Sequence, residues 1–237
     1  MTDLGELRTS VAAANAAIHD VGLVTLSFGN VSGVDRDAGV MVIKPSGVPY
    51  ADLRPETMVV VALDDGRVVE GSLRPSTDTQ THLHLYRTFP EVGGVVHTHS
   101  SSATAWAQAH RAIPCLGTTH ADYFRGSVPV SRPLTPDEIA GEYEWETGRV
   151  IVETLASEGR SATDAPAVLV GSHGPFAWGP TPAGAVEVAT ALEAVADMAF
   201  RTLLIEASAS EVGEELLRRH FDRKHGAGAY YGQRTRT

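Results

Sequence analysis

Apolar residues near the start of the chain recur at helical spacing, so residues 4–21 are expected to form an amphipathic helix. Asp3 and Glu6 form a capping-box-like start, and Gly22 marks the end of the helix. The residues that carry this periodicity are Leu4, Leu7, Val11, Ala14 and Ile18.

After Gly22 the pattern changes to short apolar runs separated by tight turns. Runs of this kind at residues 23–28, 40–43, 58–63 and 67–70 predict strands of an antiparallel meander. The Gly29-Asn30 pair interrupts this region as a break between runs.

Strands and helices alternate along the remainder of the chain. Further strands are predicted at 94–99, 113–117, 127–132, 167–171 and 175–178. Helices are predicted at 79–89, 100–109, 135–158, 182–207 and 210–225. The 237 residues fit one α/β domain spanning 1–237, with helices on both faces of a mixed, largely antiparallel sheet.

Charge and composition narrow the possible classes of protein. The chain carries 19 basic and 29 acidic residues, a net charge of −10, and its basic residues are mostly scattered, so nucleic acid is not an expected partner. No apolar stretch is long enough to cross a bilayer and no leader pattern is present, so we expect no membrane association. The single Cys115 excludes an intrachain disulfide and favours a cytoplasmic protein.

The most informative polar motif is His97-Thr98-His99, at the end of an apolar run. In an extended strand both imidazoles leave the same face, within reach of one metal ion. His173 follows another predicted strand and Asp78 lies in a polar loop, which gives a third and a fourth candidate ligand. Imidazoles with one carboxylate suit zinc or a similar divalent ion, although a His-x-His pair can also serve packing alone.

Three polar loops that contain glycine are candidates for binding an anion: residues 29–32, 44–47 and 71–78. Backbone amides and hydroxyl groups can face a phosphate, and Lys44 adds a full positive charge. The sequence has no Gly-x-x-x-x-Gly-Lys-Ser/Thr run and no Gly-x-Gly-x-x-Gly turn between a strand and a helix, so a nucleotide ligand is not indicated.

Several longer motifs together resemble the class II aldolase/epimerase family, and the resemblance covers nearly the whole chain. These motifs are Phe28-Gly29-Asn30-Val31-Ser32, Ile43-Lys44-Pro45-Ser46-Gly47, Val96-His97-Thr98-His99-Ser100, residues 117–124, residues 141–148, residues 172–179 and residues 224–232.

The resemblance implies a three-layer αβα fold and a bound Zn²⁺, with Mn²⁺ or Co²⁺ as alternatives. It assigns the metal to His97, His99 and His173, with Asp78 on or near it, and the acid-base pair to Asp122 and Tyr231. It also implies a homotetramer with active sites between subunits, where the C-terminal tail 226–237 supplies Tyr231. The substrate phosphate is assigned to Gly29, Asn30, Ser46, Gly47, Ser76 and Thr77, with Lys44 beside them. Thr77 departs from the serine that is common in the epimerases, but it keeps a hydroxyl and an amide.

The implied activity is metal-dependent epimerisation between L-ribulose 5-phosphate and D-xylulose 5-phosphate. Carbon 4 is not adjacent to the carbonyl, so inversion is expected to proceed by retro-aldol cleavage between carbons 3 and 4, through an enediolate, followed by re-addition. Three alternatives stay open: a sugar-phosphate aldolase, an enzyme acting on L-xylulose 5-phosphate, and a non-catalytic metal-binding protein. The family's aldolases carry a glutamate at the position of Asp78, so the shorter side chain favours the epimerase.

Overall fold

One antiparallel sheet of seven strands organises the computed structural model, which describes residues 4–226 and 228–230. Every pair of neighbouring strands is antiparallel. In sheet order the strands are β4 (Val68–Glu70), β3 (Val59–Ala62), β2 (Val40–Ile43), β1 (Asn30–Asp35), β5 (Gly94–His97), β7 (Gly174–Gly179) and β6 (Ala167–Val170).

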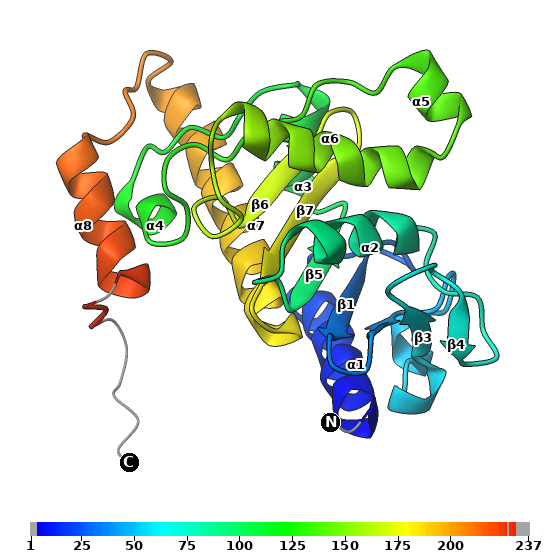
Figure 1. Cartoon of the computed structure of the whole chain (residues 1–237). Coiled ribbons are helices and arrows are strands. Elements are labelled where there is room, and N and C mark those ends of the chain that lie inside the picture. Colours follow the sequence, from blue (N-terminus) through cyan, green and yellow to red (C-terminus); the bar gives the residue numbers. More distant parts are fainter. Residues whose placement is uncertain (1–3, 227, 231–237) are drawn as a thin grey trace.

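Helices cover both faces of the sheet (Figure 1). They enclose two separate hydrophobic cores. Helices α1 (Leu4–Asp20), α3 (Ser101–Gln108) and α7 (Pro182–Ile205) pack on one face. Helices α2 (Thr79–Thr88) and α6 (Tyr143–Ser157) pack against each other and cover the other face. The remaining elements are η1 (Tyr50–Asp52), η2 (Pro55–Thr57), α4 (Thr118–Ala121), α5 (Pro136–Ala140) and α8 (Glu214–His225).

Alternation along β1 decides which of its side chains can serve a site. Val31 points into the core beneath α1 and α7. Ser32 points to the opposite face, where its hydroxyl contacts α2, and the side chain of Asn30 reaches the loop that precedes α2. Because Asn30 lies opposite His97 in the β1–β5 pairing, this polar face of β1 leads directly to the histidine motif.

The predicted fold class is confirmed, and so are the helix near the N-terminus and the helices that become α2, α3 and α7. The strand predicted at 23–28 is wrong: this segment is a loop, and β1 begins at Asn30, where a break was expected. Leu26 and Gly29 both have positive φ angles, which an extended strand does not tolerate.

The strands predicted at 113–117 and 127–132 are also wrong. They make only isolated bridges, Ile113 with Val128 and Val130 with Leu169, the latter parallel. Pro114 and Pro129 lack the N–H groups that a continuous ladder needs.

Three predicted boundaries need correction. The helix predicted at 135–158 is two helices, α5 and α6, because the backbone leaves helical geometry at Gly141. The last helix begins at Glu214 rather than near residue 210, and β5 ends at His97, two residues before its predicted end. The short α4, which precedes Asp122, was not expected.

Along the described residues, no helix combines the length and apolarity that a bilayer crossing requires.

Candidate active site

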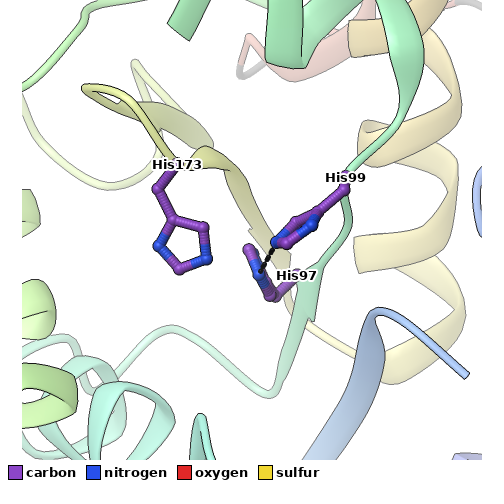
Figure 2. A group of neighbouring side chains, drawn as sticks. All are labelled: His97, His99 and His173. Atoms are coloured by element: carbon purple, nitrogen blue, oxygen red, sulfur yellow. Dashed lines mark hydrogen bonds between the residues drawn. The ribbon is translucent and has the colours of Figure 1, made fainter. Parts of the chain in front are cut away.

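Three histidines, from the end of β5 and from the turn between β6 and β7, converge at one end of the sheet (Figure 2). His97 is the last residue of β5, His99 lies just beyond it, and His173 lies in the turn between β6 and β7. Their ligand nitrogens all lie within 4.8 Å of one another, and Nε2 of His97 is 3.1 Å from Nε2 of His99. The two rings converge although His99 lies outside the strand that was expected to align them.

The hydrogen bonding of His97 fixes which nitrogen is available to a ligand. Its Nδ1 lies 3.0 Å from the carbonyl oxygen of Pro175, and because a carbonyl can only accept, Nδ1 carries the proton. Nε2 is therefore left with a lone pair that points toward His99, as in metal-binding histidines held by an outer partner.

The other two histidines favour the neutral form that a metal requires. Burial, followed by the electrostatic cost of a second imidazolium beside His97, lowers the pKa of His173 to about 3. The same two causes lower the pKa of His99. Imidazole nitrogens that share one tetrahedral ion lie about 3.3 Å apart, given bonds of about 2.0–2.1 Å. This donor set therefore fits a divalent metal ion.

Asp78 stands beside the histidines at the start of α2. Its carboxylate accepts a 2.6 Å hydrogen bond from Nδ2 of Asn30. Burial alone would raise the pKa of Asp78, but the charges of His97 and His82 and the Asn30 hydrogen bond hold it below its usual value. Asp78 is therefore an anion at neutral pH. Oδ1 of Asn30 is buried without a partner in the described part of the chain, so its acceptor capacity is unused.

A cavity of about 380 Å³ opens next to the histidines and is lined by parts of all three loops that the sequence proposed for an anion. Lys44 is only 2% exposed, and its Nζ donates to the carbonyl of Ser27 at 3.2 Å. Burial lowers the pKa of Lys44, while the charge of Asp78 opposes that shift. The predicted residues that line the cavity are Gly29, Asn30, Lys44, Ser46, Gly47, Ser76, Thr77, Asp78, His97, His99 and His173.

Backbone hydrogen bonds join two of these loops. The amide of Ser46 donates to the carbonyl oxygen of Arg74 at 2.9 Å, and the amide of Ser76 donates to the carbonyl oxygen of Lys44 at 3.0 Å. The Ser46 amide is thus already used, so this residue has its hydroxyl left for a ligand. The pairing holds Lys44 and Ser76 at fixed positions on the same wall of the cavity.

Gly29 is required where it stands. Its φ of +78° is left-handed, and an added Cβ would lie 2.9 Å from the carbonyl oxygen of His97. The loop can pass this close to the histidine strand because the side chain is absent.

Asp122 lies in a different setting from the other predicted site residues. It follows α4 and does not line the histidine cavity. Arg223 of α8 holds its carboxylate through Nε at 2.8 Å and a second nitrogen at 2.5 Å, and His220 contacts it at 3.0 Å. Burial would raise the pKa of Asp122, but these partners hold it below its usual value. The carboxylate is therefore ionised while these partners stay in place.

Tyr231 lies outside the described residues. Tyr143 and Glu144 are among the cavity-lining residues that received no role from the sequence. The Tyr143 hydroxyl lies 3.4 Å from Nδ1 of His173. Both residues lie in the 141–148 motif, which could have drawn attention to them. The sequence shows which residue types the motif contains, but it does not show that they lie close to the histidines.

A three-histidine donor set beside a cavity lined by the buried Lys44, at one end of a sheet between two helical layers, is the arrangement of an α/β protein that could hold a metal ion. The chain belongs to the class II aldolase and adducin N-terminal domain family, whose model matches residues 9–200.

Individual relatives agree with this assignment. The chain is 52% identical to the L-ribulose-5-phosphate 4-epimerase UlaF of Salmonella paratyphi C (strain RKS4594), over 97% of this chain and 99% of the relative. Among solved structures, an L-fuculose 1-phosphate aldolase matches with a TM-score of 0.77 and 22% identity, covering 92% and 95% of the two chains. YgbL of Klebsiella pneumoniae, described as a putative aldolase/epimerase/decarboxylase, matches with a TM-score of 0.71 and 24% identity, over 92% and 99%. At these identities the two structures establish the fold alone.

Proposed function

We propose that this protein is a metal-dependent L-ribulose-5-phosphate 4-epimerase that produces D-xylulose 5-phosphate. The observation that carries the proposal is the 52% identity to a named epimerase over nearly the full length of both chains. The cavity supports the proposal, because groups that can bind a phosphate and histidines that can bind a metal line the same space.

Substrate binding follows from the charges around the cavity. The buried ammonium of Lys44 and the hydroxyls of Ser46, Ser76 and Thr77 would hold the phosphate. In a molecule with a net charge of −10, this local cation is what attracts an anionic sugar.

His97, His99 and His173, with Asp78 beside them, would hold the divalent ion, which we propose is Zn²⁺. When bound, the ion supplies a Lewis acid that stabilises negative charge on the carbonyl oxygen and the carbon 3 hydroxyl of the sugar.

Inversion at carbon 4 requires a proton acceptor on each side of that carbon. Removal of the proton from the carbon 4 hydroxyl turns carbon 4 into an aldehyde, and the electrons of the C3–C4 bond move to the carbonyl side as an enediolate. The enediolate is that of dihydroxyacetone, and the aldehyde fragment is glycolaldehyde phosphate, because the phosphate is on carbon 5. After this aldehyde group rotates, the bond re-forms on its opposite face and the oxygen regains a proton. We assign the two proton positions to Asp122 and Tyr231.

These two residues also favour an active site shared between subunits. Asp122 does not line the cavity of its own chain, so in a homotetramer the carboxylate and Tyr231 would come from a neighbouring copy. A cytoplasmic location is proposed because the single cysteine, Cys115, is free and buried.

The deciding experiment is a coupled assay of purified protein on L-ribulose 5-phosphate and on L-xylulose 5-phosphate, scored for D-xylulose 5-phosphate. We expect turnover of the first, and no solvent deuterium at carbon 4 of the product. Asp122→Asn should lower kcat by about 10²–10⁴-fold with metal content unchanged. Rapid net condensation of dihydroxyacetone phosphate with an aldehyde would instead make the protein an aldolase.

A further inference from the structure

Three polar side chains, spaced four residues apart, face the sheet from α2 and from Asp78, the residue just before this helix. Asp78, His82 and Tyr86 lie on this one stripe because residues four apart share a helix face. All three meet the polar face of β1. Asp78 accepts from Asn30, while Nδ1 of His82 and the hydroxyl of Tyr86 contact the Ser32 hydroxyl at 2.7 Å and 2.8 Å.

Most of this network is buried completely. Ser32, His82 and Tyr86 are each 0% exposed, inside a face of the sheet that is otherwise filled by apolar side chains. Nε2 of His82 has no partner in the described part of the chain, so the ring keeps its Nδ1 contact while leaving its other nitrogen unpaired. Buried polar groups of this kind cost stability compared with apolar packing, which points to a positional role.

Two physical routes join His82 to the metal centre. Through the backbone, His82 lies one helical turn after Asp78, and its amide donates to the Asp78 carbonyl at 3.0 Å. Through the side chains, the His82 ring meets Phe176 edge-on at a centroid distance of 6.0 Å. Phe176 in turn stacks on His97 at 4.1 Å, with 16° between the ring planes.

We propose that the Ser32–His82 hydrogen bond is a positioning contact of the metal centre. It fixes α2 against β1, and thereby places the Asp78 carboxylate and the His97 ring at the separation a divalent ion needs. His82 is a positioning residue that acts through Asp78 and Phe176, without contact with the ion. The inference rests on the metal centre of the proposed function.

The chain offers a matched set of variants. Ser32→Ala and His82→Leu remove the contact, whereas His82→Asn can keep a hydrogen bond at the Nδ1 position. Tyr86→Phe removes an equally buried hydroxyl from the same Ser32, but one turn farther from Asp78. It therefore controls for the loss of a buried hydrogen bond alone.

Each full-length protein is stripped of metal and titrated with Co²⁺, whose visible absorption reports affinity and ligand geometry. Unfolding of the metal-free form in urea is measured in parallel. We expect Ser32→Ala and His82→Leu to weaken Co²⁺ binding by about 10–100-fold, as is typical for partners of metal ligands, and to alter the spectrum. Tyr86→Phe should shift the urea midpoint as Ser32→Ala does while keeping the wild-type affinity, and His82→Asn should restore most of the affinity.

An unchanged Co²⁺ affinity and spectrum in Ser32→Ala, with a shift of the urea midpoint alone, would overturn the inference. Equal weakening by His82→Asn and His82→Leu would do the same, because the hydrogen bond would then not matter. If His82→Leu does not fold, the comparison of Ser32→Ala with Tyr86→Phe decides. These outcomes leave wild-type Co²⁺ binding intact, whereas a wild-type protein that binds no Co²⁺ would overturn the proposed metal centre itself.

Discussion

At the scale of single residues, the site is built from ordinary side chains whose environment sets their chemistry. The Pro175 carbonyl determines the tautomer of His97, and burial keeps His173 neutral. Arg223 and His220 keep the Asp122 carboxylate ionised. Each effect comes from a partner distant in sequence, so residue type alone could propose a role but could not establish the protonation state.

The histidine cluster makes a direct prediction at this scale. His99→Ala removes one of three converging imidazoles and should weaken zinc binding by more than about 100-fold, beyond the 10–100-fold typical of outer-shell changes. Metal content after dialysis, measured by elemental analysis, checks this. His19→Ala is the control, because that histidine is exposed on α1 and outside the cluster. Equal zinc content in both variants would contradict the assignment.

At the scale of elements, the site depends on the junctions at the ends of strands. The loop before β1 passes over the end of β5 at Gly29, and the turn between β6 and β7 brings His173 to the same place. These junctions use backbone conformations that most residues resist: Gly29 and Ser172 both have positive φ. The strands therefore provide the scaffold, and the loops at their ends position the candidate metal ligands.

Gly29→Ala should therefore destabilise the protein more than Gly39→Ala does. Both glycines have left-handed φ, which costs an alanine about 1–2 kcal/mol, but only Gly29 is crowded. The contact with the His97 carbonyl should add roughly 1–3 kcal/mol, as overpacking does. Urea unfolding of the two variants measures the difference. Equal losses would mean that the loop moves away from β5 without cost.

At the scale of the whole molecule, two properties reach beyond the site: the response of stability to acid, and association between copies. Both depend on groups that folding either buries or leaves on the surface. His120, 3% exposed, donates from Nε2 to the carbonyl of Gly126 at 3.0 Å. On the outside, α7 carries large apolar side chains in contact with solvent, Met198, Phe200, Leu204 and Ile205.

Acid should destabilise the metal-free protein partly through His120. Burial lowers its pKa to about 4, whereas the unfolded chain titrates near 6.5, so the unfolded state takes up the proton first. The stability contributed by the neutral ring is complete above about pH 6.5 and is lost as the pH falls toward 4, by roughly 3 kcal/mol in all. His120→Gln keeps a donor toward Gly126 and should flatten this part of the stability curve. Parallel curves for the two proteins between pH 7 and pH 4 would rule out this cause.

The apolar surface of α7 agrees with the proposed homotetramer. Sedimentation analysis should then give a mass of about four times the 25.1 kDa of the chain. Phe200→Glu should lower that mass. Ile139→Glu should not, although Ile139 on α5 is exposed to nearly the same extent, 55% against 54% for Phe200. A wild-type protein that sediments as a monomer would refute the assembly.

The sequence by itself determined the local features of this protein. Helical periodicity located α1, α2 and α7, and the His97-Thr98-His99 spacing proposed two candidate metal ligands whose rings do converge. These features depend on residues within a few positions of each other, so they can be read directly from the order of side chains.

Only the tertiary structure decided which distant residues meet. Pairing of β1 with β5 sets Asn30 opposite His97, and α8 reaches Asp122 across about a hundred positions of sequence. The role of His82 depends on Ser32, fifty residues earlier, and no local pattern records that contact. The physical reason is that hydrophobic periodicity specifies which face of an element is buried, whereas packing of the folded chain selects its partners.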